Sequence, residues 1–99
     1  MSSAIIKISV DGSIERIETE DNALVHEAIH EFIGNLTDHF HGKLEGEQAL
    51  CFCDDIGIAK RLPVNKVATE MYDACCRPEY RGTHSIRGPV VAITGKLAE

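Results

Sequence analysis

The chain has 99 residues, of which 43% are hydrophobic and 26% are charged, and its formal net charge is −6. This length fits one domain with one modest core, and the composition excludes the disordered and fibrous classes. No stretch approaches the roughly 18 apolar residues of a membrane-spanning helix, and the first residues lack the pattern of a secretory signal. We therefore expect a cytoplasmic protein whose four cysteines are reduced thiols.

Charge is divided unevenly along the chain. Residues 1–59 contain three basic and twelve acidic residues, a balance of −9, whereas residues 60–99 contain seven basic and four acidic ones, a balance of +3. This division favours association with a partner or with a second copy of the chain, although uneven sampling of solvated side chains explains it equally well. Because the isoelectric point is near 5.3, bulk nucleic-acid binding is not expected.

The N-terminal third predicts a hairpin followed by a helix. Residues 4–10 and 13–19 read as two strands, and the Asp-Gly pair between them is a hairpin turn signal. Asp21 or Asn22 can cap a helix that runs to about residue 33, where a glycine follows.

The rest of the chain predicts three strands and one helix. We expect a strand over residues 36–41, a polar turn over 42–47 and a buried strand over 48–53. A helix over 66–76 and a closing strand over 89–94 complete the domain. The order β-β-α-β-β-α-β over residues 1–99 predicts one α+β domain of two layers, with a mainly antiparallel sheet and both helices on one face.

The pentapeptide HEAIH at residues 26–30 matches H-E-x-x-H, in which two histidines bind zinc and the glutamate acts as general base. His26 and His30 are one helical turn apart and share one side of the predicted helix. A catalytic zinc needs a third ligand, but we expect His39 and His41 on the sheet face opposite this helix. We therefore interpret the pentapeptide as a solvated helix flank, with a metal site at His26 and His30 as the alternative.

The cysteines do not have the spacing of a zinc or redox motif. Cys51 and Cys53 share one face of a strand, and Cys75 and Cys76 are adjacent at the end of a helix. There is no C-x-x-C, so we expect most of them to pack as small hydrophobic side chains. We expect no cofactor.

An arginine-rich loop follows the second predicted helix. It places arginines at Arg77, Arg81 and Arg87 beside Tyr80 and His84. Arginine forms bidentate contacts with phosphate or carboxylate, and tyrosine offers a stacking face, so the loop suits an anion, a nucleotide or an acidic partner. The alternative is a solvated loop whose arginines pair with acidic residues of the chain itself.

Two segments carry a resemblance to a known family. LPVNKVAT, residues 62–69, opens the second helix, and GPVV, residues 88–91, opens the last strand. With the layout of the other elements, these segments resemble a small family of phage- and plasmid-borne domains of unknown function. The resemblance implies an accessory protein of a bacteriophage or mobile element that acts inside the bacterial cell, and it assigns no catalytic residue.

We therefore expect a non-enzymatic accessory protein that binds a host or phage protein, in a counter-defence or regulatory role, with a homodimer as a further expectation. A binder of small anions or nucleotides through the loop at residues 77–87 is the second hypothesis. A metal-dependent hydrolase at His26, Glu27 and His30 is the third.

Overall fold

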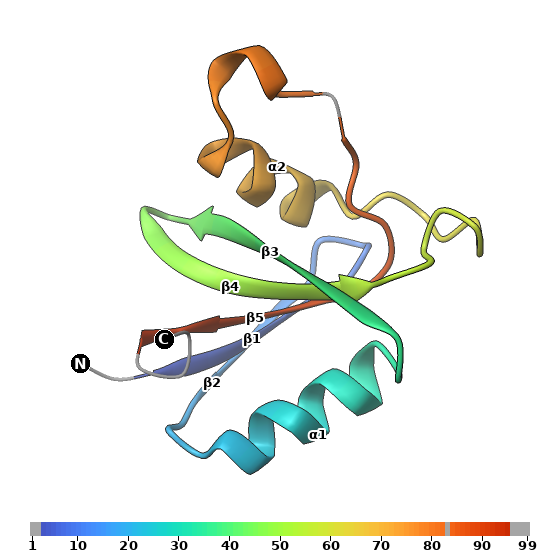
Figure 1. Ribbon diagram of the computed structural model, residues 1–99. Coiled ribbons are helices and arrows are strands. Elements are labelled where there is room, and N and C mark those ends of the chain that lie inside the picture. The colour runs from blue at the N-terminus through green and yellow to red at the C-terminus, as the bar shows by residue number, and fades with distance from the viewer. Residues whose placement is uncertain (1–2, 83, 96–99) are drawn as a thin grey trace.

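The computed structural model describes residues 3–82 and 84–95. In this part of the chain, antiparallel strands form one sheet in the order β2-β1-β5-β4-β3, and two helices pack against it (Figure 1). The α+β class, the antiparallel sheet and the element order are confirmed. The strands are Ala4–Ile8 (β1), Ile14–Glu18 (β2), Thr37–Leu44 (β3), Glu47–Asp54 (β4) and Val90–Thr94 (β5). The helices are Asn22–Phe32 (α1), Lys66–Cys75 (α2) and the short 3-10 helix Pro78–Tyr80 (η1). No helix among the described residues is long and apolar enough to cross a membrane.

The two helices lie on opposite faces of the sheet, so the prediction that both cover one face is wrong (Figure 1). Ile5 belongs to the cluster under α1, and its neighbour Ile6 belongs to the cluster under α2. Successive residues of a strand point to opposite faces, and every residue of β5 is buried. A continuous apolar run such as β5 is typical of a strand that is covered on both faces.

The hairpin of β3 and β4 is longer than predicted, because the turn is only Glu45-Gly46 rather than residues 42–47. Both turn residues have positive φ, 51° and 82°, as a tight hairpin turn requires. Gly42 lies inside β3, and a Cβ atom there would stand 3.2 Å from both Cys51 Sγ and Met71 Cβ. Gly42 therefore allows α2 to pack closely on β3 and does not form a turn.

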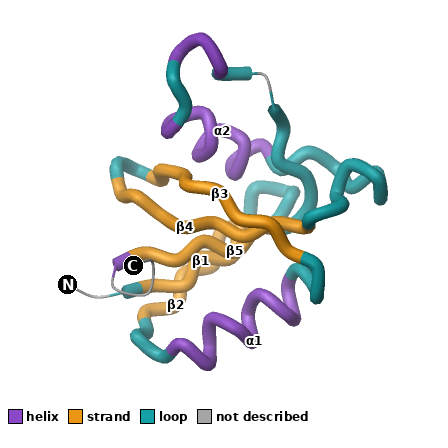
Figure 2. Tube along the Cα trace, in the orientation of Figure 1, coloured by secondary structure: helices purple, strands orange, loops and turns teal. Residues whose placement is uncertain are grey.

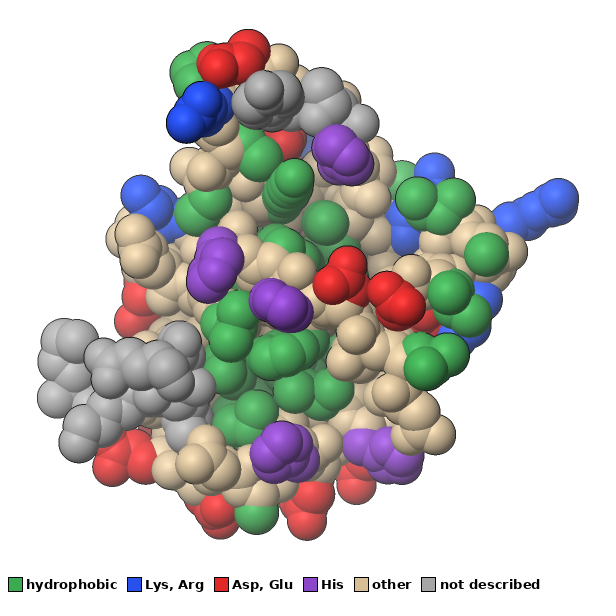
Figure 3. Space-filling model, in the orientation of Figure 1, with side chains coloured by type: hydrophobic (Ala, Val, Ile, Leu, Met, Phe, Trp, Pro, Cys, Tyr) green, Lys and Arg blue, Asp and Glu red, His purple; other side chains and the backbone are tan. Residues whose placement is uncertain are grey.

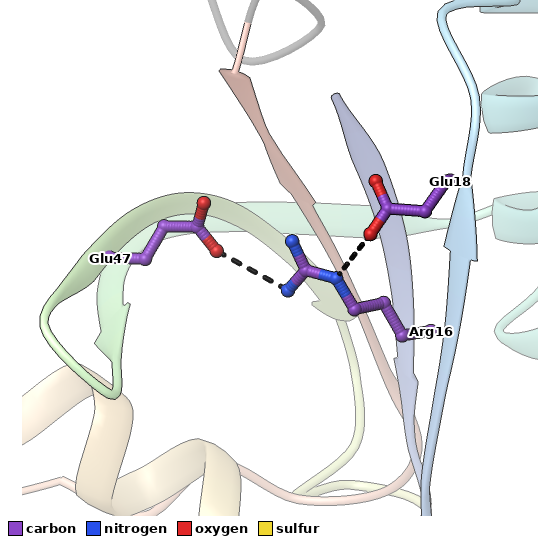
Figure 4. Close-up of polar contacts among 3 residues, drawn as sticks. All are labelled: Arg16, Glu18 and Glu47. Carbon is purple, nitrogen blue, oxygen red and sulfur yellow. Dashed lines mark hydrogen bonds and ion pairs between the residues drawn. The ribbon is translucent and has the colours of Figure 1, made fainter. Parts of the chain in front are cut away.

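An exposed ion-pair group links β2 to the start of β4 (Figure 4). The Arg16 side chain reaches from β2 toward the start of β4, where its Nη1 lies 3.3 Å from Glu47 Oε1. Its Nε lies 2.9 Å from Glu18 Oε1. Exposed pairs of this kind are worth about 0–1 kcal/mol, so the group fixes side-chain positions more than it stabilises the fold.

Candidate functional site

The LPVNKVAT segment forms a buried polar junction centred on Asn65. Asn65 is fully buried and caps α2, with its Oδ1 accepting a hydrogen bond of 3.1 Å from Ala68 N. Its Nδ2 donates to Ile8 O at 3.1 Å and to Gly88 O at 2.9 Å. One side chain therefore joins the end of β1, the start of α2 and the entry to β5.

Thr69 and Gly88 complete the junction, at the place where the loops before α2 and before β5 run side by side (Figure 2). The Thr69 hydroxyl donates to Asn65 O at 2.8 Å and accepts a hydrogen bond of 2.9 Å from Ile86 N. Gly88 has φ +80°, and a Cβ there would lie 2.7 Å from Leu62 Cδ1. The two segments that carry the family resemblance thus contact each other, and their polar groups are engaged in holding the fold.

The HEAIH residues lie on α1 as predicted, but the histidines and the glutamate face different surroundings. His26, Glu27 and His30 are all exposed, and Glu27 also lines a hollow of about 160 Å³ together with Lys7 and Ile17. The glutamate thus faces the β1–β2 side of the helix. In the part of the chain that the structure describes, no group of three or more His, Cys, Asp or Glu side chains is placed to hold a metal ion.

The expectation that His39 and His41 lie on the face opposite α1 is wrong. His39 pairs with Phe52 across β3 and β4, and His41 pairs with Leu50, so each histidine shares a face with its partner. Phe52 and Leu50 pack on the cluster beneath α1. Phe40, the residue between the two histidines, points to the other face and packs on the cluster beneath α2. Figure 3 shows histidines on both sides of a hydrophobic surface on the front face.

The cysteines are free thiols, and the two on β4 are poor nucleophiles. Burial, followed by the nearby thiols of Cys75 and Cys53, raises the pKa of Cys51 to about 12. Burial, followed by the carboxylates of Asp38, Asp54 and Asp55, raises the pKa of Cys53 to about 11. Because the thiolate is the reactive species, both side chains stay protonated and unreactive near neutral pH.

The arginine-rich loop does not gather its residues into one site. Arg81 is exposed, and its Nε donates to Asp73 O at 3.1 Å. Arg87 is half-buried at the other end of the loop, where its Nη1 donates to Leu62 O at 3.0 Å. Arg77 is exposed just before η1, and the side chain of Tyr80 lies outside the described part of the structure. Arg81 therefore binds a backbone oxygen of α2, and Arg87 binds one in the loop before α2.

A cleft, which we call the α2-side cleft, opens beside β3 where His84 meets α2. The Tyr72 ring lies between those of Phe40 and His84, with centroid distances of 5.8 and 6.0 Å. A cavity of about 230 Å³ lies beside these rings, and a neighbouring cavity of about 490 Å³ extends toward Arg87. The two cavities share Asp38, Cys53, Ser85 and Ile86, and the larger one is also lined by Asp54 and Asp55.

One edge of the sheet is the open side of β3, which we call the β3 edge. Asp55 N donates to Leu36 O at 3.1 Å, so the even-numbered residues of β3 direct their backbone groups to β4. The odd-numbered residues, among them His39 and His41, therefore direct theirs outward. The Asp38 side chain accepts a hydrogen bond of 2.8 Å from His39 N, which caps one of these outward groups.

Exposed hydrophobic side chains lie at one end of the β3 edge. Leu36 is 61% exposed, Ile56 40% and Ile58 74%. Figure 3 shows hydrophobic, acidic and histidine side chains together on the face along which β3 runs. Of the predicted site residues whose side chains the structure describes, only His84 and Arg87 line the cleft. The sequence analysis did not identify Asp38, Phe40 and Tyr72 as site residues. The one signal in the sequence is that Asp38 and Phe40 are two residues apart in a predicted strand and therefore share one face of it.

Comparison with known proteins finds no relative: no family model, no curated protein and no solved structure matches the chain. The resemblance to a family of mobile-element domains therefore stays a prediction.

Proposed function

We propose that the chain is a non-enzymatic binding protein that captures an extended segment of a protein partner along the β3 edge. The observation that carries the proposal is the row of outward backbone groups at the odd-numbered residues of β3, beside the exposed Leu36, Ile56 and Ile58. Open strand edges pair readily with other chains, and strand addition is a recurring mode of peptide recognition. A role as a phage or plasmid accessory protein in the bacterial cytoplasm rests only on the LPVNKVAT and GPVV resemblance.

The second hypothesis, a binder of small anions, receives less support. Arg81 and Arg87 are engaged with backbone oxygens, and the cleft near Arg87 is lined by three aspartates, Asp38, Asp54 and Asp55. Carboxylates beside a cavity repel an anionic ligand.

Proline substitution at His41 tests the proposal. His41→Pro removes an outward N–H but keeps the hydrogen bonds between β3 and β4, and proline is tolerated at such edge positions. The matched controls are His41→Thr, which keeps the N–H, and Ile14→Pro, which places proline at the start of the other edge strand, β2. Circular dichroism confirms that each variant is folded.

Tagged protein and the variants are incubated with bacterial lysate, and the retained proteins are identified by mass spectrometry. We expect a protein that wild type, His41→Thr and Ile14→Pro retain and that His41→Pro loses. Equal retention by His41→Pro, or no retained protein, would overturn the proposal. Recovery of the chain alone would overturn it too, and would identify the edge as the surface of a homodimer.

A further inference from the structure

A strand added to the β3 edge would present every second side chain to the α2-side cleft. Asp38 and Phe40 pair with Cys53 and Cys51, which belong to the cluster beneath α2, so both point to that side of the sheet. A residue of an added antiparallel strand that lies opposite Asp38 shares this side, with Cβ atoms about 4.5–5.5 Å apart. The cleft is therefore within reach of a long side chain of the captured segment.

The charge of the cleft favours a cation. Lys60 Nζ lies 2.8 Å from Asp54 Oδ2, but Asp38 and Asp55 form no ion pair among the described residues. Arg87, the arginine in the lining, donates to Leu62 O and forms no ion pair within the same part of the chain. Burial, and after it the carboxylates of Asp38, Asp54 and Asp55, raise the pKa of Cys53, which agrees with a negative charge beside the cleft.

The aromatic wall favours an arginine over a lysine. The Tyr72 ring contacts those of Phe40 and His84 in edge-on geometry, with interplanar angles of 67° and 70°. A guanidinium group is planar and weakly hydrated, so it can stack on a ring and form paired hydrogen bonds with a carboxylate at the same time. A lysine ammonium group is a strongly hydrated point charge and gains less from such a wall.

We propose that the segment captured at the β3 edge carries an arginine whose guanidinium group binds in the α2-side cleft between Asp38 and the Phe40–Tyr72 rings. This inference rests on the strand capture proposed above and names the chemistry of the captured segment. The cavities beside β3, the carboxylates of Asp38 and Asp55 that line them, and the row of rings are the observations that support it.

The test uses N-acetyl-arginine amide as a probe for the cleft, with the N-acetyl amide of citrulline, its neutral analogue, as the matched ligand. Both are titrated into isotope-labelled full-length protein, and amide chemical shifts are followed by NMR. We expect the arginine probe to shift the signals of residues 38–40, 72 and 84–86 in a saturable manner, and the citrulline probe to leave them unchanged. Equal shifts with both probes, or none with either, would overturn the inference.

Two variants locate the probe. Asp38→Asn removes the charge but keeps an oxygen that can accept the hydrogen bond from His39 N, and we expect it to weaken arginine binding by roughly threefold to tenfold. Glu70→Gln, a charge removal on the exposed side of α2, should bind as wild type does. Equal affinity of wild type and Asp38→Asn would also overturn the inference. The probe needs no strand edge, so His41→Pro should bind it as wild type does. A failure of the arginine inference can therefore be distinguished from a failure of the proposed strand capture.

Discussion

Replacement of Asn65 tests whether the LPVNKVAT segment stabilises the fold through a junction rather than through a helix cap. Asn65→Ala removes the cap on Ala68 N and two hydrogen bonds, to Ile8 O and Gly88 O. A buried hydrogen bond contributes about 0.5–1.5 kcal/mol and a cap about 1 kcal/mol, and carbonyls left without a partner add to the loss. We therefore expect the free energy of unfolding to fall by about 3–4 kcal/mol, a large part of the 5–15 kcal/mol typical of a domain.

Asn65→Asp separates the two roles. Aspartate is as good a cap as asparagine, but its second oxygen would face the carbonyl oxygens of Ile8 and Gly88 in a fully buried site. At pH 7 we expect Asn65→Asp to lose at least as much stability as Asn65→Ala. If capping were the whole role, Asn65→Asp would be close to wild type.

Urea unfolding followed by far-ultraviolet circular dichroism measures these differences, and Asp21 gives the matched control. Asp21 caps α1 through a single hydrogen bond of 2.9 Å from Ala23 N and is exposed, so Asp21→Ala should lose only about 1 kcal/mol. An Asn65→Ala loss no larger than that of Asp21→Ala, or wild-type stability of Asn65→Asp, would refute the junction.

Three further predictions concern single sites. Gly88→Ala should lower the free energy of unfolding by about 1–2 kcal/mol because of its φ of +80° and the contact with Leu62, which urea unfolding measures, and a neutral result would contradict it. Thr94→Val should raise the melting temperature by several degrees, since the buried Thr94 Oγ1 has no hydrogen-bond partner among the described residues; a lower melting temperature would count against this. The hydrogen bond from Lys60, followed by that from Ile56 N, lowers the pKa of Asp54 in the folded protein. The ionised Asp54 side chain therefore stabilises the fold above the unfolded-state pKa of about 4, and this stabilisation is lost as pH falls through the folded-state pKa. Asp54→Asn should therefore be about 1 kcal/mol less stable than wild type at pH 7 and equal to it in acid, and a gap that persists in acid would exclude this cause.

The sequence was sufficient for the order of the helices and strands, although it predicted too long a turn between β3 and β4. Asp21, one of the two residues expected to cap the first helix, caps α1, because the chemistry of a cap is contained within a few residues. The prediction that both helices lie on one face was wrong because it was based on the order of the elements and did not use the continuous apolar run of β5. Buried residues on both sides of one strand require a helix on each face, and this error also put His39 and His41 on the wrong side.

The candidate site was less accessible to sequence reasoning. Its lining comes from β3, β4, α2 and the loop before β5, and only the fold brings these segments together. Arg81 and Arg87 were predicted to form one site because they are close in the sequence, but closeness in sequence does not determine where a long side chain points. Asp38 and Tyr72 are far apart in the chain and give no combined signal.

The junction and the cleft are physically connected, so the LPVNKVAT segment would affect the proposed binding without contacting a ligand. Ile86 lines the cleft, and its backbone N–H and C=O are held by Thr69 Oγ1 and Asn65 N at 2.9 and 2.8 Å. The junction therefore fixes the position of residues 84–86 above Asp38. A protein that keeps this core but replaces Asp38 or Tyr72 would retain the fold and the open β3 edge, and under the proposed strand capture it would select a different side chain in the captured segment.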